Sequence, residues 1–575
     1  MKKRSICALI ALALAPAPIL ADDPMPIPAG TVDSPMIDGF PGYSTMPIFT
    51  VGEVIDDYTP PGILDGLGAY EYDSDTVRVL ANHELLHFRG YTYELSGNPG
   101  LELTGARVSY FDIDKDTLEV TDSGLAYDTI YDWEGNAPTD KTFLGTPFYD
   151  SDADTWSSPD GLSRLCSSSY FEPGEFGNGR GLEDGIFFTG EEDGGDFNNV
   201  GGAEWALDAA TNSLWQLPDL GRGAWENVTV LDTGNSNTVA ILLMDDTSPF
   251  DVDGDGDKEA APLYLYVGVK DPDGDFPAQN GLRGGKLHVW VARKGARSPE
   301  DFAGTGSLAG DWVEIDNNRR ADEADPTGET GYDLNGYPTQ KTLWTRAEAL
   351  GAFGFSRPED VATNPNRGNE AVLASTGRSS DFNKADRVGT IYTIKTDFAN
   401  KTARLKIIYD GDADPTQAIR SPDNLDWADD GMVYIQEDRA ASGLFGYAVT
   451  NANEAGIVKL DPATGKTTRI ANINRSRIFD ASLGNDDVDP SDDVVLAYET
   501  AVDVDSADVG AWESSGILDV SNLWDAAPGT IFLLDVQAHG IEDQDVFNPD
   551  FDSRITDSDL VEGGQLIILT KDPVE

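Results

Sequence analysis

Acidic side chains recur at the ends of short strand-like segments, and this is where chemistry is expected. Glu191 follows an apolar run, whereas Glu226, Glu359 and Asp423 stand just before such runs. Carboxylates that are brought together in a confined site repel one another unless cations lie between them. Oxygen ligands favour Ca²⁺, Mg²⁺, Mn²⁺ or ferric iron over zinc. The spacing therefore predicts a centre that holds several metal ions.

Two of the four histidines also lie at the ends of apolar segments. His83 follows the run 76–81 and precedes Glu84, and His539 follows the run 531–536. A β-propeller presents ligands to its central channel at such positions. We predict Glu84 as a metal ligand and His539 or His83 as a proton donor, with a purely structural histidine as the alternative for each.

A separate acidic loop combines carboxylates with glycines. Asp251, Asp253 and Asp255 alternate with Val252 and Gly254, a spacing that can wrap oxygen atoms around one Ca²⁺. An EF-hand loop would have a glutamate at its twelfth position, where this chain has a proline, and no flanking helices are evident. The loop is either a structural calcium site or a solvated acidic turn. In neither case is it expected to be the active site.

The segments that must position these residues are predicted to be strands. Runs rich in β-branched and aromatic residues recur from about residue 76 to the end, separated by Gly, Asp, Asn and Pro. Several are joined by acidic turns, as around Asp114, Asp208 and Asp461, which are typical of the outer hairpin of a propeller blade. We predict an all-β fold, a β-propeller over residues 61–575, preceded by a Pro- and Gly-rich segment at 22–60. A β-sandwich array and a β-helix are the competing folds.

The charge and the N-terminus constrain partners and compartment. The chain has 575 residues and a formal net charge of −62. Such a surface repels phosphate backbones and anionic lipids, which argues against nucleic-acid and membrane partners. A basic start followed by an apolar stretch predicts a signal peptide at residues 1–21, with a retained anchor as the alternative. The mature protein is expected to be periplasmic or secreted, with Cys166 unpaired once Cys7 is removed.

A set of short motifs, in order, resembles the PhoX-type alkaline phosphatases. The motifs are Asn82-His83-Glu84, Thr189-Gly190-Glu191-Glu192, Gly223-Ala224-Trp225-Glu226, Arg357-Pro358-Glu359-Asp360 with Asn364-Pro365, and Pro422-Asp423-Asn424-Leu425. The resemblance implies a secreted six-bladed propeller that uses iron and calcium. It implies that Glu191, Glu226 and Glu359 are metal ligands, that Asp423 and Asn424 are metal or structural ligands, and that Arg357 holds phosphate.

The chain departs from the family pattern within two of these motifs, and its C-terminal quarter does not match the pattern. Gly190 stands where the family has a cysteine that ligates iron, and Cys166, which lies well before it, is not expected to replace it. Trp225 stands where the family has a histidine before the glutamate. These departures predict a divergent member that binds Ca²⁺ and for which Fe³⁺ is an open question.

The implied activity is hydrolysis of a small-molecule phosphate ester. Clustered cations would attract the dianionic substrate and activate water for in-line attack, and Arg357 would bind a pair of phosphate oxygens. Two alternatives stay open at this point. One is a calcium-dependent propeller lactonase or esterase, and the other is a non-catalytic, calcium-stabilised secreted propeller.

Overall fold

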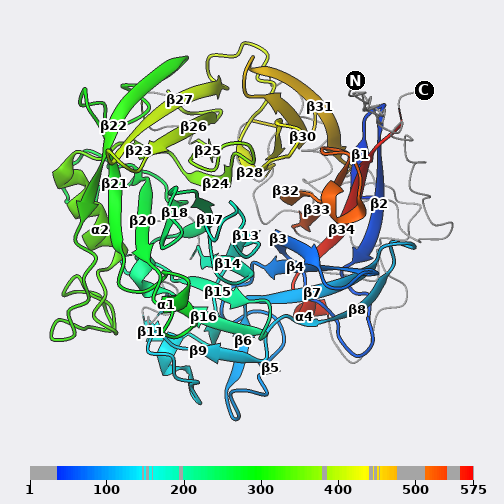
Figure 1. The fold of residues 1–575 in the computed structure, drawn as a ribbon, viewed down its shortest axis with the longest axis horizontal. Coiled ribbons are helices and arrows are strands. Elements are labelled where there is room, and N and C mark those ends of the chain that lie inside the picture. Colours follow the sequence, from blue (N-terminus) through cyan, green and yellow to red (C-terminus); the bar gives the residue numbers. More distant parts are fainter. Residues whose placement is uncertain are drawn as a thin grey trace, which may run out of the picture.

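The innermost strands of the molecule, each the first in chain order of an antiparallel meander, surround its axis (Figure 1). There are six of them in the part of the chain that the structure describes. The computed structural model describes residues 35–144, 148–150, 155–157, 159–192, 199–377, 382, 385–439, 444–445, 450–451, 453–474, 512–539 and 557–573. Within these ranges each of the six strands contacts the next, and the last contacts the first. The sheets therefore form a closed ring, and the predicted β-propeller is confirmed.

The first three sheets, or blades, follow one another along the chain. The first contains β3 (Leu64–Glu71), β4 (Thr76–His83), β7 (Arg107–Asp114) and β8 (Val120–Leu125). The second contains β13 (Leu165–Phe171), β14 (Ile186–Glu191), β15 (Glu204–Asp208) and β16 (Ser213–Gln216), with β9 (Thr129–Tyr131) at its edge. The third contains β17 (Trp225–Leu231), β18 (Thr238–Asp245), β20 (Tyr264–Val269) and β21 (Lys286–Ala292).

The last three blades complete the ring. The fourth contains β24 (Pro358–Thr363), β25 (Glu370–Ser375), β26 (Thr390–Asp397) and β27 (Thr402–Asp410), and β22 (Gly306–Ile315) joins it to the third. The fifth contains β28 (Pro422–Trp427), β29 (Val433–Glu437), β30 (Gly456–Asp461), β31 (Lys466–Ile473) and β1 (Ile37–Gly39). The sixth contains β32 (Glu513–Asp519), β33 (Ile531–Ala538), β34 (Gly563–Lys571) and β2 (Tyr43–Thr50).

Short elements connect the blades. The strands are β5 (Tyr93–Glu94), β6 (Glu102–Gly105), β10 (Phe148–Asp150), β11 (Thr155–Ser157), β12 (Gly161–Leu162), β19 (Ala261–Pro262) and β23 (Gly354–Phe355). The helices are α1 (Phe276–Gln279), α2 (Gln340–Leu350) and α4 (Asp557–Leu560), with 3-10 turns at Lys141–Leu144, Pro218–Leu220 and Ser521–Trp524. Of the helices in the described ranges, none is long and apolar enough to cross a membrane.

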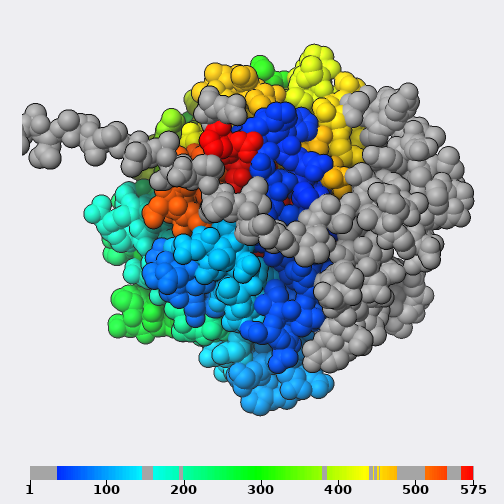
Figure 2. Space-filling model, turned by 90° about the vertical axis from the view of Figure 1, so that its right-hand side faces the viewer, coloured from blue at the N-terminus to red at the C-terminus, as the bar shows by residue number. Residues whose placement is uncertain are grey.

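The ring is closed by strands from opposite ends of the sequence. β2 pairs antiparallel with β34, so that the N-terminal and C-terminal strands lie side by side, blue against red in Figure 2. β1 pairs with β31 of the fifth blade. Residues 37–50 are therefore part of the propeller, and the expected boundary at residue 60 is wrong. The predicted signal peptide, residues 1–21, lies outside the described residues.

The acidic turns of the outer hairpins have the predicted role. The Asp114 carboxylate accepts hydrogen bonds from the backbone N–H groups of Asp116 and Thr117, between β7 and β8. Asp208 and Asp461 cap the β15–β16 and β30–β31 turns in the same way. Each turn joins the two outermost strands of the antiparallel meander in its blade, as expected for a propeller.

Candidate metal centre

The innermost strands begin with the same irregularity. In β3, β13, β17, β24 and β28 the register with the second strand shifts over two residues just after the first paired position. These pairs are Asp65-Gly66, Cys166-Ser167, Glu226-Asn227, Glu359-Asp360 and Asp423-Asn424. A β-bulge re-aims the side chains of its strand. The first residue of every pair belongs to a cluster of potential metal ligands around the axis.

A left-handed backbone residue precedes four of these bulges by two positions. The residues are Ile63, Arg164, Arg357 and Ser421, with φ of 52°, 45°, 55° and 41°. Such conformations cost non-glycine residues about 1–3 kcal/mol each and persist only where the surroundings enforce them. The same turn thus directs the chain toward the axis in four blades.

The ligand atoms form four overlapping groups, here called the acidic ring. The groups are Asp65–Glu84–Cys166, Cys166–Glu192–Glu226, Glu226–Glu359–Asp423 and Asp423–Asp438–Glu513. Within each group one ligand atom per residue lies within 4.8 Å of the others. Since Cys166, Glu226 and Asp423 each belong to two groups, the sites are linked around the axis.

A second set of side chains enters the centre from the ends of the second strands. Glu84, Glu192 and Asp438 are each the first residue after β4, β14 and β29, respectively. Asp246 and His539 hold the same position after β18 and β33. Five of the blades therefore deliver side chains from the end of their second strand, in addition to those at the start of the first strand.

Without bound cations, burial makes the charged form of the carboxylates in the acidic ring energetically unfavourable. Burial, assisted by the neighbouring carboxylates, raises the pKa of Asp65, Glu226 and Asp423 well above the usual range. It also raises the pKa of Glu84 to about 7 and that of Glu513 to about 8. A bound cation would reverse these shifts because it favours the charged carboxylate.

The donor set fits metal ions. Oε2 of Glu226 is buried and has no hydrogen-bond partner, which is the state expected of a ligand atom that awaits a cation. The carboxylate oxygens suit Ca²⁺, and the Cys166 thiolate would suit a softer metal such as iron. Burial and Asp65 raise the pKa of the Cys166 thiol, which donates to Oδ2 of Asp65 at 3.0 Å. Metal coordination would remove that proton.

Two arginines flank the acidic ring. Nε and Nη2 of Arg357 donate to the two oxygens of Asp246 at 3.0 and 2.8 Å, and Nη2 lies 2.8 Å from Glu359. Arg164 forms ion pairs with Glu84 and Glu192. Burial alone would raise the pKa of Glu192, but the charge of Arg164 outweighs it and the pKa is lowered. The Arg357 and Arg164 side chains are 18% and 29% exposed, so both can be reached from solvent.

His539 lies beside the acidic ring and contacts a carboxylate outside it. Its Nδ1 is 2.7 Å from Glu562. Burial disfavours the charged imidazole, but Glu562, Glu513 and Glu84 together raise the pKa of His539 to about 9. His83 differs, since its ring nitrogens contact Gly62 O and Ser109 Oγ within the first blade. Burial lowers the pKa of His83 to about 3, which favours the structural alternative for this histidine.

The structure brings together most of the predicted ligands but not all. Glu84, Glu226, Glu359 and Asp423 lie in the acidic ring, as expected. Glu191 does not. Its oxygens accept hydrogen bonds from the backbone N–H groups of Ser163 and Ala203 at 3.2 and 3.1 Å. Because side chains alternate along a strand, Glu191 points away from the axis and Glu192 takes the expected place.

Two further predictions need correction or qualification. Gly190 is not a vacant ligand position, because a Cβ there would lie 2.4 Å from Cβ of Trp225. Cys166, which was not expected to serve, lies in the acidic ring instead. Asn424 donates through Nδ2 to Ser167 Oγ at 3.0 Å and faces Asp65 at 3.4 Å, so it links strands below the ring.

The predicted calcium loop lies outside the acidic ring. Asp251, Asp253 and Asp255 have oxygen atoms within 4.8 Å of one another and are largely exposed. Both Asp251 oxygens accept backbone hydrogen bonds, from Gly254 and Gly256. The Asp251 carboxylate therefore organises the loop through its own backbone.

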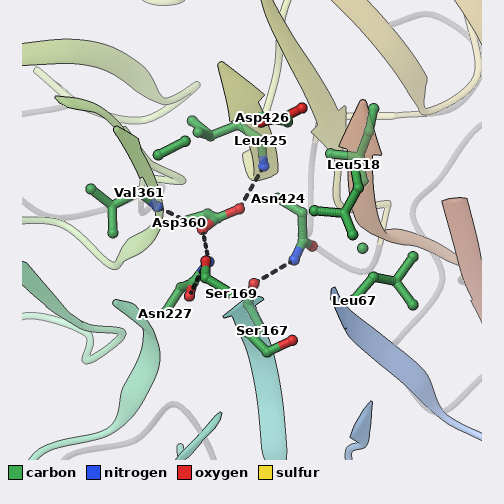
Figure 3. A pocket seen from close by; sticks show the side chains of 14 residues that line it. Leu67, Ser167, Ser169, Asn227, Asp360, Val361, Asn424, Leu425, Asp426 and Leu518 are labelled. Atoms are coloured by element: carbon green, nitrogen blue, oxygen red, sulfur yellow. Dashed lines mark hydrogen bonds between the residues drawn. The ribbon is translucent and has the colours of Figure 1, made fainter. Parts of the chain in front are cut away.

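A polar cavity of about 50 Å³ lies where the innermost strands converge (Figure 3). The second residues of four bulges line it, namely Ser167, Asn227, Asp360 and Asn424. Asp360, Asn227 and the backbone of Leu425 are joined by hydrogen bonds across it. Each of these bulges therefore places its first residue in the acidic ring and its second residue at the cavity.

Comparisons with known proteins agree with this architecture. Residues 214–478 match the family model for the alkaline phosphatase PhoX. The structure is similar to that of Pseudomonas fluorescens PhoX, solved in complex with vanadate, a transition state analogue, with a TM-score of 0.56 and 14% identity over 94% of this chain and 97% of that chain. No curated protein matches the sequence. The family match and the shared fold confirm the resemblance to the PhoX-type alkaline phosphatases.

Proposed function

We propose that this protein is a metal-dependent phosphomonoesterase that acts on small phosphate esters. The observation that carries the proposal is the acidic ring, with Arg357 and Arg164 at its accessible side. A substrate dianion would be repelled by carboxylates alone, so the site is useful for this chemistry only with cations. The family match supports the same activity.

The proposed roles follow from charge and position. The chemistry that bound cations supply is neutralisation of the phosphoryl oxygens and activation of the attacking water. Arg357 is held by Asp246 and offers a planar guanidinium to the phosphoryl group. The pKa of His539 is raised to about 9 by its carboxylate neighbours, and its proposed role is to give a proton to the leaving alkoxide.

We propose Ca²⁺ as the principal metal of the acidic ring, with iron at the groups that include Cys166. Six to eight oxygen ligands suit Ca²⁺, whereas a thiolate suits a transition metal. The loop at Asp251 stays a prediction for a structural Ca²⁺. Residues 1–21 support export, and we propose a periplasmic or secreted protein. N-terminal sequencing of the exported form tests this, since retention of residue 1 would contradict it.

The activity is tested by hydrolysis of p-nitrophenyl phosphate by the purified protein before chelation, after chelation, and after Ca²⁺ or iron is added back. Chelation is expected to abolish phosphate release and metal to restore it. Bound Ca²⁺ without phosphate release, under calcium- and iron-replete conditions, would reject the phosphatase and direct attention to lactone substrates.

The Arg357→Ala variant tests the phosphate-binding role. Loss of charge-assisted hydrogen bonds worth about 1.5–3 kcal/mol predicts a fall of about 10- to 150-fold in kcat/KM. Arg293→Ala is the matched control, because Arg293 pairs with Asp311 at an exposed edge of the third blade. Equal activity in the two variants would remove Arg357 from the mechanism.

A further inference from the structure

The carboxylate of Asp360 makes contacts that no role assigned so far explains. It is buried beside the axial cavity and accepts hydrogen bonds from three partners (Figure 3). Its Oδ1 accepts from the backbone N–H of Val361 at 2.6 Å and from Nδ2 of Asn227. Its Oδ2 accepts from the backbone N–H of Leu425 at 2.7 Å. The three partners belong to three neighbouring innermost strands, β24, β17 and β28.

These partners adjoin one group of the acidic ring. Asn227 follows Glu226, Asp360 follows Glu359, and Leu425 lies two positions after Asp423. Glu226, Glu359 and Asp423 are the members of a single ligand group. One carboxylate thus connects the three bulges that present this group.

We propose that Asp360 is a positioning residue that holds Glu226, Glu359 and Asp423 at the spacing a metal ion requires. The inference rests on the proposed function, because it assumes that the acidic ring binds metal. Asp360 itself does not need to touch the metal. Residues that orient the ligands of a metal commonly change its affinity by about 10- to 100-fold when they are replaced.

The chemistry of the site calls for a carboxylate. Val361 and Leu425 are the first paired residues after their bulges, and their backbone N–H groups donate to Asp360. A buried N–H without an acceptor is costly. Asp360 supplies two acceptor oxygens and no donor, which matches the three donors that face it. An asparagine would place an NH₂ group against one of those donors.

The effect of Asp360 should be local. On the other side of the cavity, Asn424 links to Ser167 by a hydrogen bond that does not involve Asp360. The group Asp65–Glu84–Cys166 has its own support, since Nδ2 of Asn82 donates to the Cys166 carbonyl at 2.6 Å. Loss of the Asp360 contacts should therefore weaken the group Glu226–Glu359–Asp423 most and leave Asp65–Glu84–Cys166, which shares no residue with it, intact.

The test is calorimetric titration of the metal-free full-length chain with CaCl₂, combined with elemental analysis. In Asp360→Asn, the site that contains Glu226, Glu359 and Asp423 should weaken about 10- to 100-fold, while the site at Asp65–Glu84–Cys166 keeps its affinity. Asn227→Ala removes one of the three hydrogen bonds and should weaken the same site by less. The double variant Asp360→Asn/Asn227→Asp restores a donor–acceptor pair with the roles exchanged, and should recover part of the lost affinity.

Asp112→Asn is the matched control. Asp112 is a buried carboxylate that binds Arg78 in the outer part of the first blade, so its loss should lower thermal stability without changing Ca²⁺ affinity. Wild-type affinity in Asp360→Asn, or in Asn227→Ala should the first variant not fold, would overturn this inference alone. Absence of any Ca²⁺ binding to the wild-type acidic ring would overturn both the inference and the proposed function.

Discussion

Replacement of Glu226 by glutamine should stabilise the metal-free protein, and bound metal should offset most or all of that gain. Glu226 is 1% exposed and belongs to two groups of the acidic ring. Its Oε2 has no hydrogen-bond partner, and Oε1 accepts only a long bond from Ser167 N at 3.3 Å. In the metal-free protein the residue contributes repulsion, whereas in the metal-loaded protein it contributes a ligand.

The size of the metal-free effect follows from charge and proton uptake. Two like charges 4.8 Å apart repel by about 3.5 kcal/mol at an effective dielectric constant of about 20. The alternative, protonating Glu226 at pH 7 against its ordinary pKa of 4.5, costs about 3.4 kcal/mol. Glutamine avoids both costs. Glu226→Gln should therefore stabilise the metal-free protein by up to about 3 kcal/mol at pH 7.

The pH dependence has a definite direction. Burial raises the pKa of Glu226 in the folded chain, so the folded protein binds more protons than the unfolded one and loses stability as pH rises. The advantage of glutamine should therefore disappear near pH 4.5, where the unfolded chain is itself half protonated, and grow toward neutrality. With metal bound, loss of a charged ligand should lower affinity by about 10- to 100-fold, or about 1.4–2.8 kcal/mol.

The assay is chemical denaturation of wild type and Glu226→Gln in EDTA and in CaCl₂, at pH 4.5 and pH 7. Glu191→Gln is the matched control, because Glu191 is a neighbouring glutamate that binds two backbone N–H groups outside the acidic ring. It should destabilise the protein to the same extent with and without metal. Destabilisation by Glu226→Gln in EDTA at pH 7 would refute the reasoning, because repulsion would then not govern the metal-free ring.

Two further outcomes are expected. Cys166→Ser should lose transition-metal content while retaining Ca²⁺, as measured by elemental analysis, since the thiolate is the soft ligand in two groups; unchanged iron content would remove Cys166 from the ligand set. His83 is neutral when folded because burial lowers its pKa to about 3, so its contribution to stability is present above pH 6.5 and is lost as pH falls. Wild type should lose about 1.6 kcal/mol more than His83→Gln between pH 6.5 and pH 5, as measured by urea unfolding. Equal losses of stability in the two proteins would contradict this.

The propeller could be predicted from the sequence because its outer hairpins are local. Asp114, Asp208 and Asp461 cap turns with their own neighbours, and such turns depend on a few consecutive residues. The closing strands could not be predicted in this way. β2 and β34 are separated by almost the whole chain, and the Pro- and Gly-rich composition around β2 suggested a separate segment.

The metal centre could be predicted where a carboxylate lies at the start of the innermost strand of a blade. Glu226, Glu359 and Asp423 stand at the starts of innermost strands, and the sequence marks those positions. The choice between Glu191 and Glu192 depended on where β14 ends, and an error of one residue reverses the direction of a side chain. Strand boundaries cannot be located so closely from composition.

Cys166 was overlooked because it was compared with a linear motif rather than with a position in a blade. The signal that identifies it is Arg164, two residues earlier, which repeats the arrangement of Arg357 before Glu359. Asp65 follows Ile63 in the same way. A search for residues two positions after each inter-blade turn would have found both, although the left-handed backbone that defines the turn is visible only in the structure.

The arrangement of the acidic ring connects metal binding to closure of the fold. Its ligands come from the first two strands of successive blades, and Cys166, Glu226 and Asp423 are each shared by adjacent groups. A cation held by one group therefore ties together strands from neighbouring blades and fixes a ligand of the next group. Without cations, the same carboxylates oppose ring closure through repulsion, which β2–β34 pairing and the apolar cores between blades must overcome. Bound metal should therefore stabilise the N-terminal and C-terminal blades at the same time. We expect metal loss to loosen the ring as a whole rather than a single loop.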